Sequence, residues 1–180
     1  DIGLGNKAVL LEDAVVLYAD LDGSTNMVDV KKWQFSAEIY KSFLYCAAKI
    51  IRDEAGDITA YDGDRIMAIF IGDGKCDRAA RVALKLRWAV VNIIEPSMKA
   101  VYSTDFRIAH TVGIDMSNLR AVRTGVRGDN DLVWVGRAAN YAAKLTTLSS
   151  DYPSRMTGVV YSELSSNLKT SDSKLTILFT

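Results

Sequence analysis

The sequence contains a single histidine, two cysteines and no excess charge of either sign. Lys plus Arg and Asp plus Glu number 22 each, so no strong overall field draws the protein to nucleic acid or to a membrane surface. Cys46 and Cys76 lie in apolar helical segments, and we interpret them as free buried thiols rather than as a disulfide or a metal site. His110 lies within an expected strand, where a hydrogen-bonded structural histidine is favoured over a catalytic base.

Long apolar runs are also absent. The longest are far too short to span a bilayer, and the chain does not open with the basic and apolar regions of a signal peptide. These absences predict a cytoplasmic protein. No repeat, low-complexity segment or linker interrupts the 180 residues, of which 49% are hydrophobic and 24% charged. That composition is typical of one globular domain with a sizeable core.

The segment 14–26, AVVLYADLDGSTN, is the part around which the rest of the chain is arranged. Its apolar run at residues 15–19 is typical of a strand buried on both faces, and an acidic turn containing Gly23 follows directly. Carboxylates suit Mg²⁺, and a glycine turn that enters a helix suits phosphate. An ordinary strand-to-helix turn, in which Asp and Ser cap the helix and Gly bends the chain, explains these residues equally well.

Two long amphipathic helices are expected. The first begins at Ser24, Thr25 or Asn26 and runs to about Arg52, and the second begins at Asp73 or Lys75 and ends at Pro96. The apolar side chains recur at helical spacing and are Phe35, Ile39, Phe43, Ala47 and Ile50 in the first helix and Val82, Leu86, Ala89, Val90 and Ile93 in the second.

A β-hairpin is predicted between the two helices. Asp62-Gly63 stands between strand-like runs at 58–61 and 64–71, and this dipeptide favours a type I′ turn. That turn would place Tyr61 opposite Asp64 and Ala60 opposite Arg65. Asp64 would then lie at the start of a strand, held outward on a rigid support.

The second half of the chain is expected to continue with strands at 106–114, 119–126, 132–135, 159–161 and 175–179. Between them lies an alanine-rich helix on which Asn140 and Lys144, four residues apart, share one face. This pair is either functional or a solvent-facing stripe. Arg120, Arg123 and Arg127 form either an exposed strand face or partners of a triphosphate, with the exposed face as the simpler interpretation.

The order of elements predicts an α+β fold with a ferredoxin-like β-α-β-β-α-β core, in which two helices cover one face of an antiparallel sheet. In this topology the end of the first strand lies beside the hairpin. Asp20 and Asp64 would therefore converge next to the glycine turn. Two carboxylates so placed are suited to two-metal phosphoryl transfer.

At these residues the chain resembles the class III nucleotidyl cyclases. The resemblance rests on VLYADLDGST at 16–25, GDRIMAIF at 63–70, VGI at 112–114 and GRAANYAAKL at 136–145, in the family's order and approximate spacing. It implies that residues 1–180 are a single nucleotidyl cyclase catalytic domain with its core at about 14–161. It also implies a head-to-tail homodimer with active sites at the interface.

The resemblance assigns roles to individual residues. One chain would bind two Mg²⁺ or Mn²⁺ ions through Asp20, Asp64 and the carbonyl of Leu21, and its turn residues would bind phosphates. Those turn residues are Gly23, Ser24 and Thr25. The other chain would supply Asn140, which orients the ribose in the family, and Lys144, where the family has an arginine. The substitution keeps the charge and loses the bidentate fork.

The purine-reading positions depart from the family pattern. They fall at Ala60 and at Val133, or at Leu132 if Val135 is an insertion, and none of these side chains can hydrogen-bond a base edge. Tyr61 and Trp134 add aromatic bulk where a purine would fit, and Tyr61 and Arg65 are candidate base-pocket residues. In these respects the chain is similar to the pyrimidine cyclases of the Pycsar anti-phage systems. The similarity implies a UTP or CTP cyclase, with UTP preferred, whose product activates a separate effector.

Three alternatives stay open: an adenylate cyclase, a catalytically degenerate regulatory module, and a ferredoxin-like nucleic-acid-binding module. The neutral charge and the acidic turn argue against nucleic-acid binding. The joint presence of Asp20, Asp64, Asn140 and a cation at 144 argues against degeneracy.

Overall fold

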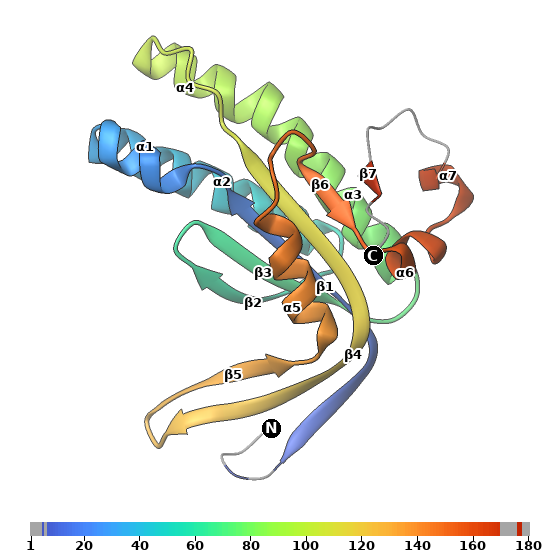
Figure 1. The fold of residues 1–180 in the computed structure, drawn as a ribbon. Coiled ribbons are helices and arrows are strands. Elements are labelled where there is room, and N and C mark those ends of the chain that lie inside the picture. The colour runs from blue at the N-terminus through green and yellow to red at the C-terminus, as the bar shows by residue number, and fades with distance from the viewer. Residues whose placement is uncertain (1–4, 6, 170–175, 178–180) are drawn as a thin grey trace.

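The computed structural model describes residue 5, residues 7–169 and residues 176–177. Its centre is a curled seven-stranded sheet with long helices on one face and a shorter helix on the other (Figure 1). The strands are β1 Ala8–Leu21, β2 Asp57–Asp62, β3 Arg65–Phe70, β4 His110–Val126, β5 Asp129–Val135, β6 Ser154–Met156 and β7 Thr176–Ile177. The helices are α1 Ser24–Val30, α2 Trp33–Asp53, α3 Lys75–Ala89, the π-helical turn η1 Val90–Ile94, α4 Glu95–Tyr102, α5 Arg137–Thr146, α6 Gly158–Ser162 and α7 Ser166–Lys169.

The sheet order confirms the predicted fold class. Strands β2-β3-β1-β4 are neighbours and pair antiparallel, as a ferredoxin-like core requires. Strand β5 folds back antiparallel on the far end of β4. Beyond that core, β6 pairs parallel with β4, and β7 pairs parallel with β6.

Strand β1 divides the interior into two cores because its side chains alternate between the two faces. Val15, Leu17 and Ala19 pack into the larger core beneath α2 and α3. Ala14 and Val16 pack into a smaller core beneath α5. Asp20 continues the second series by alternation, so its side chain belongs to the face that carries α5.

The first long helix is two helices in the structure. Gly23, with φ 71, is the N-cap of α1, and α1 ends at Val30. Lys31 and Lys32 are extended before α2 begins. Val28 and Val30 are exposed, whereas α2 buries a residue every fourth position from Phe35 to Ile51. The prediction of one helix from residues 24–26 to Arg52 is therefore wrong at this break.

Pro96 does not end the second long helix as predicted. The helix continues from α3 through η1 into α4, and Pro96 lies in the first turn of α4. Proline has no N–H to donate within a helix, and its ring clashes with the carbonyl four residues earlier. Here a π-helical turn precedes Pro96 and changes the hydrogen-bond register. The wider turn of η1 accommodates the proline.

Residues 110–114 and 119–126 of the two predicted strands belong to one strand in the structure, and residues 106–109 lie outside it. Strand β4 runs unbroken from His110 to Val126 along the curl of the sheet, and β5 is the strand that returns (Figure 1). Residues 159–161 lie in α6, so the strand predicted there is wrong. Of the strand predicted at 175–179, residues 176–177 form β7 and the others lie outside the described residues.

His110 and the two cysteines are structural. The His110 ring packs against Phe43 in the larger core, and neither ring nitrogen has a hydrogen-bond partner within the described residues, so the hydrogen-bonded histidine predicted from the sequence is wrong. Cys46 and Cys76 are free thiols, as predicted. Burial raises the pKa of the Cys76 thiol to about 11, which keeps it protonated and unreactive. None of the helices among the described residues combines the length and apolar character that a membrane span requires.

Candidate active site

Asp20 lies at the C-terminal end of β1, between the neighbouring strands β3 and β4. It pairs with Thr111 of β4, and its carboxylate contacts Arg65 at the start of β3. Burial raises the pKa of the Asp20 carboxyl; the Arg65 guanidinium opposes that shift, and the nearby Asp64 charge adds to it. The contact between Asp20 and Arg65 places the Asp20 carboxylate beside the hairpin, whose turn contains Asp64.

The hairpin that carries Asp64 has a different register from the predicted one. Asp62 pairs with Arg65 and Tyr61 with Ile66, so Gly63 and Asp64 form the turn. Only Gly63 has a positive φ, at 61°, whereas a type I′ turn needs two such residues. Asp64 is therefore a turn residue, next to Arg65 rather than opposite Tyr61.

The carboxylate of Asp64 has an unsatisfied oxygen. Its Oδ2 is buried and has no hydrogen-bond partner within the described residues. A buried acceptor without a partner is costly unless a ligand satisfies it. Two carboxylates and the backbone carbonyl of Leu21 form a hard-oxygen donor set, which suits Mg²⁺ or Mn²⁺. The residues present therefore fit a divalent cation.

Protein ligands alone do not complete such a site. Within the described ranges, 5, 7–169 and 176–177, no three His, Cys, Asp or Glu residues cluster to hold a metal ion. Mg²⁺ in phosphoryl-transfer sites is commonly bound by one or two carboxylates together with substrate phosphates. A two-carboxylate site is thus suited to a cation shared with a nucleotide.

The turn after β1 follows directly on Asp20 and Leu21. The Asp22 N–H donates to the carbonyl of Ala109 at 3.0 Å, which ties the turn to the segment before β4. Gly23 takes the left-handed conformation at the start of α1, and Ser24 and Thr25 form the first helical residues. The predicted phosphate-binding residues thus lie within a few residues of the carboxylate that they would serve.

The predicted base-pocket residues do not all share one face. Ala60 and Tyr61 are exposed on β2 beside the hairpin turn, and Tyr61 is 57% exposed. Trp134 packs against the smaller core, and its buried Nε1–H has no acceptor within the described residues. Val133 is exposed and, by strand alternation, points to the opposite face from Trp134. Within one chain, Trp134 and Val133 therefore cannot line the same pocket.

Asn140 and Lys144 project from α5 into solvent. Both are exposed, and neither forms a hydrogen bond or ion pair with Asp20 or Asp64 in the described structure. The Lys144 ammonium lies 6.0 Å from the centre of the Tyr141 ring. A single chain thus presents the two carboxylates and the two α5 residues as separate groups.

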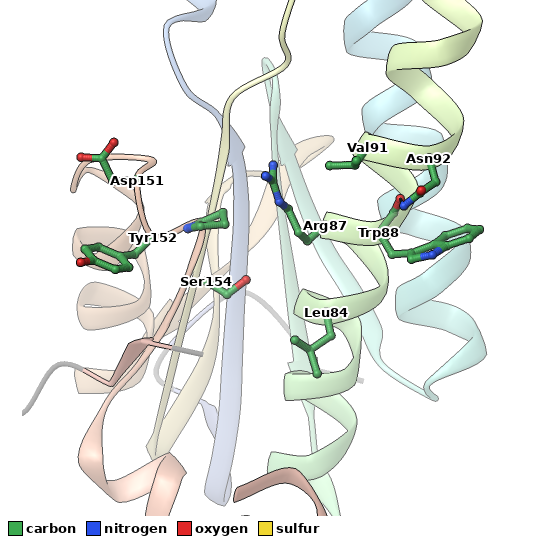
Figure 2. A pocket seen from close by; sticks show the side chains of 9 residues that line it. Leu84, Arg87, Trp88, Val91, Asn92, Asp151, Tyr152 and Ser154 are labelled. Carbon is green, nitrogen blue, oxygen red and sulfur yellow. Dashed lines mark hydrogen bonds between the residues drawn. The ribbon is translucent and has the colours of Figure 1, made fainter. Parts of the chain in front are cut away.

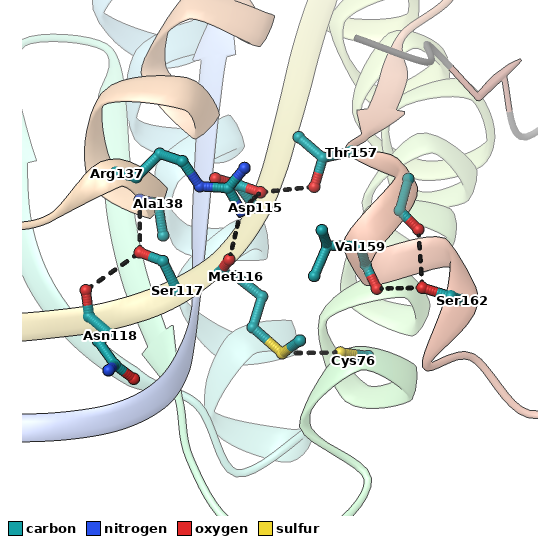
Figure 3. Close-up of polar contacts among 11 residues, drawn as sticks. Cys76, Asp115, Met116, Ser117, Asn118, Arg137, Ala138, Thr157, Val159 and Ser162 are labelled. Carbon is teal, nitrogen blue, oxygen red and sulfur yellow. Dashed lines mark hydrogen bonds and ion pairs between the residues drawn. The ribbon is translucent and has the colours of Figure 1, made fainter.

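Helix α5 is anchored to β4 by polar contacts at its first turn (Figure 3). The Arg137 guanidinium donates to the Met116 carbonyl at 2.8 Å and contacts Asp115 at 3.3 Å. Ser117 accepts a hydrogen bond from the Ala138 N–H at 2.9 Å and thereby caps the helix. These contacts are not predictable from the sequence, because nothing in the local pattern of these residues indicates that positions 21 and 22 residues apart meet.

Asp115 is the buried centre of this anchor. It is fully buried in β4, and its Oδ1 accepts a short hydrogen bond from the Thr157 hydroxyl at 2.5 Å as well as the contact from Arg137 (Figure 3). These partners offset the desolvation of Asp115 only at Oδ1, because its Oδ2 is buried without a hydrogen-bond partner within the described residues. Asp115 therefore links the start of α5, strand β4 and the end of β6.

A separate pocket of about 610 Å³ lies between α3 and the segment before β6 (Figure 2). Arg87, Trp88 and Val91 line one wall, and Tyr152 lies on the opposite side. None of the predicted catalytic or metal-binding residues lines it. This pocket is therefore distinct from the carboxylate site.

The chain has close relatives of known type. No protein-family model matches it. A uridylate cyclase of Burkholderia cepacia is 62% identical over 164 residues, which cover 91% of this chain and 71% of that protein. A uridylate cyclase of Xanthomonas perforans is 56% identical over 172 residues, which cover 95% and 74%.

Solved structures of cyclases share the fold. The adenylyl cyclase CyaB of P. aeruginosa matches with a TM-score of 0.76 and 17% identity, over 88% of this chain and 82% of that one. A bacterial light-regulated adenylyl cyclase matches with a TM-score of 0.79 and 19% identity, over 91% of this chain and 48% of that one. At these identities the likeness establishes the fold alone.

Proposed function

This chain belongs to the uridylate cyclases, which are class III nucleotidyl cyclases, and from that membership we propose that it converts UTP to 3′,5′-cyclic UMP and pyrophosphate. The observation that carries the proposal is the 62% and 56% identity to two uridylate cyclases over nearly the whole chain. The reaction forms a bond between the ribose 3′-oxygen and the α-phosphorus and breaks the bond from that phosphorus to the leaving pyrophosphate.

Asp20, Asp64 and the Leu21 carbonyl would hold two Mg²⁺ or Mn²⁺ ions. The ions would neutralise charge on the triphosphate and make the 3′-hydroxyl more acidic. The buried Oδ2 of Asp64, which has no hydrogen-bond partner among the described residues, supports this assignment. The backbone of Gly23, Ser24 and Thr25 would hold phosphate oxygens, because the first N–H groups of a helix have no partner within the helix.

A second copy of the chain would complete the site. Asn140 and Lys144 are exposed on α5, and among the described residues neither forms a hydrogen bond or ion pair with Asp20 or Asp64. In a head-to-tail homodimer, the α5 of one subunit would face the Asp20 and Asp64 of the other. Asn140 would then orient the ribose, and Lys144 would place a positive charge near the α-phosphate.

The base positions support a pyrimidine rather than a purine. Ala60 and Val133 cannot hydrogen-bond a base edge, and the Tyr61 ring would take up room that a second purine ring needs. The indole N–H of Trp134, on the face that carries α5, is a buried donor that has no acceptor within the described residues. These features argue against adenylate cyclase activity, and CTP is the competing pyrimidine.

The biological role that we propose is second-messenger synthesis in anti-phage defence. Cyclic UMP would activate a separate effector through binding of the product, without contact between the two proteins. A cytoplasmic location, where UTP is available, fits this role.

The test is turnover of each of the four ribonucleoside triphosphates by the purified protein with Mn²⁺ or Mg²⁺, read by chromatography of the cyclic product. We expect cyclic UMP as the main product and its loss in Asp64→Ala, with thermal unfolding confirming that the variant is folded. A preference for ATP or GTP would overturn the pyrimidine assignment. No turnover of any triphosphate at high protein concentration would support the degenerate module instead.

A further inference from the structure

Arg65 lies where the sequence alone predicts a base-pocket residue, yet its guanidinium contacts a metal-binding carboxylate. Its Nη2 and Nε lie 3.0 and 3.2 Å from Oδ2 of Asp20. Both donors share a single oxygen, so the pair lacks the fork-to-fork geometry that makes arginine–carboxylate pairs strongest. The contact is therefore well formed but open to competition.

The choice of partner is selective. Asp62 lies directly opposite Arg65 in the hairpin, yet the guanidinium pairs with Asp20, which is 45 residues away in the sequence. The Arg65 side chain is 32% exposed and that of Asp20 17% exposed, so solvent screens the contact only in part. The guanidinium carbon also lies 5.9 Å from the centre of the Tyr18 ring, which holds it on the face that carries Asp20.

The positive charge of Arg65 does not balance the carboxylates at this site. Asp20 and Asp64 together carry two negative charges, and Arg65 supplies one positive charge, which is directed at Asp20. Asp64 keeps a buried oxygen that has no hydrogen-bond partner in the described part of the chain. A divalent cation would satisfy Asp64, but at Asp20 it would meet a guanidinium that already contacts the carboxylate.

We propose that Arg65 is a resident counter-ion that competes with divalent cations for Asp20 until a nucleoside triphosphate arrives and accepts the guanidinium on its phosphate oxygens. The inference rests on the proposed function, since it takes Asp20 and Asp64 as metal ligands. Arginine suits both partners, because its planar donors match carboxylate and phosphate alike. Metal and nucleotide binding then strengthen each other, and by linkage the coupling is reciprocal.

The test measures Mn²⁺ binding to the nucleotide-free protein by electron paramagnetic resonance of the unbound ion. Arg65→Gln removes the charge and keeps much of the length, so we expect Mn²⁺ to bind about fivefold more tightly, the scale of one partly exposed ion pair. Arg65→Lys keeps the charge and should stay near the wild type. Lys49→Gln removes an exposed charge of α2 and controls for the change in net charge.

The second arm adds 3′-deoxy-UTP, which cannot cyclise. In the wild type the analogue should tighten Mn²⁺ binding more than it does in Arg65→Gln, because only the wild type has a guanidinium to release. Equal or weaker Mn²⁺ binding by folded Arg65→Gln without nucleotide would overturn the proposal. Asp64→Ala separates the two failures: if it binds Mn²⁺ as the wild type does, the metal assignment itself is wrong.

Discussion

Gly113 of β4 lies directly beneath the carbonyl oxygen of Ala142 in α5. A Cβ at position 113 would come within 2.1 Å of that oxygen and 2.8 Å of the Leu145 Cβ. Gly113 is the centre of the VGI segment that contributes to the resemblance to cyclases. The glycine thus allows α5, which carries Asn140 and Lys144, to pack closely on the sheet.

Gly113→Ala should displace α5. We expect a loss of about 1–3 kcal/mol in the free energy of unfolding, the usual effect of overpacking. We also expect cyclase activity to fall by a larger fraction of its wild-type value than the free energy of unfolding does. Urea unfolding and cyclic UMP production measure the two effects. Thr124→Ala, at an exposed site further along β4, is the control. A variant with wild-type stability and activity would contradict the close packing.

Arg137→Ala should lower activity through α5 while the subunit's own carboxylate site stays intact. The lost contacts to Asp115 and to the Met116 carbonyl are charge-assisted, so we expect about a tenfold decrease in kcat. Mixing subunits tests the cause. Arg137→Ala mixed with Asp64→Ala should recover activity, because one site of the mixed dimer combines intact carboxylates with an intact α5.

Arg137→Ala mixed with Asn140→Ala should recover nothing, because both changes impair the same half of the site. Failure of the first mixture, with both variants folded and dimeric by light scattering, would show that Arg137 does not act through α5. Recovery in the second mixture would contradict the head-to-tail arrangement.

Tyr61→Ala should relax the choice of base. The exposed ring would no longer take up the space that a second purine ring needs, so we expect the preference for UTP over ATP to fall by about tenfold, the scale of pocket-size discrimination. The ratio of kcat/KM values for the two nucleotides is the measurement. Tyr45→Ala removes another exposed tyrosine ring, from α2, and should leave the ratio unchanged.

His110 should make the fold sensitive to mild acid. Burial and, to a smaller extent, Arg87 lower the pKa of the His110 ring from 6.5 to about 4. Since the folded pKa lies below the unfolded one, the stability that the neutral ring contributes is complete above pH 6.5 and decreases as the pH falls towards 4. We expect a loss of about 2–3 kcal/mol across this window.

Urea unfolding at a series of pH values, compared between the wild type and His110→Leu, isolates this contribution. The variant should lose less stability on acidification than the wild type does. Parallel curves for the two proteins would show that His110 is not the group responsible.

Periodicity was sufficient to predict several elements. The apolar run of β1 and the four-residue spacing from Phe35 to Ala47 in α2 each reflect a single face or strand, and such patterns are local. The order of these elements was enough to predict the ferredoxin-like sheet and the convergence of Asp20 with the hairpin. Pattern alone did not locate breaks such as Lys31–Lys32 or the continuation past Pro96, because neighbouring turns and packing decide them.

The amino-acid sequence by itself determined the class of fold, the family and which acidic and polar residues are available for catalysis, because these follow from short-range patterns and from the order of segments. Only the tertiary structure decided the partner of each charge. Arg65 pairs with Asp20 rather than with Asp62 opposite it, and Asp115 meets Arg137 and Thr157 across the fold. Charged side chains find their partners through space, and only the assembled sheet brings such distant positions within hydrogen-bonding distance.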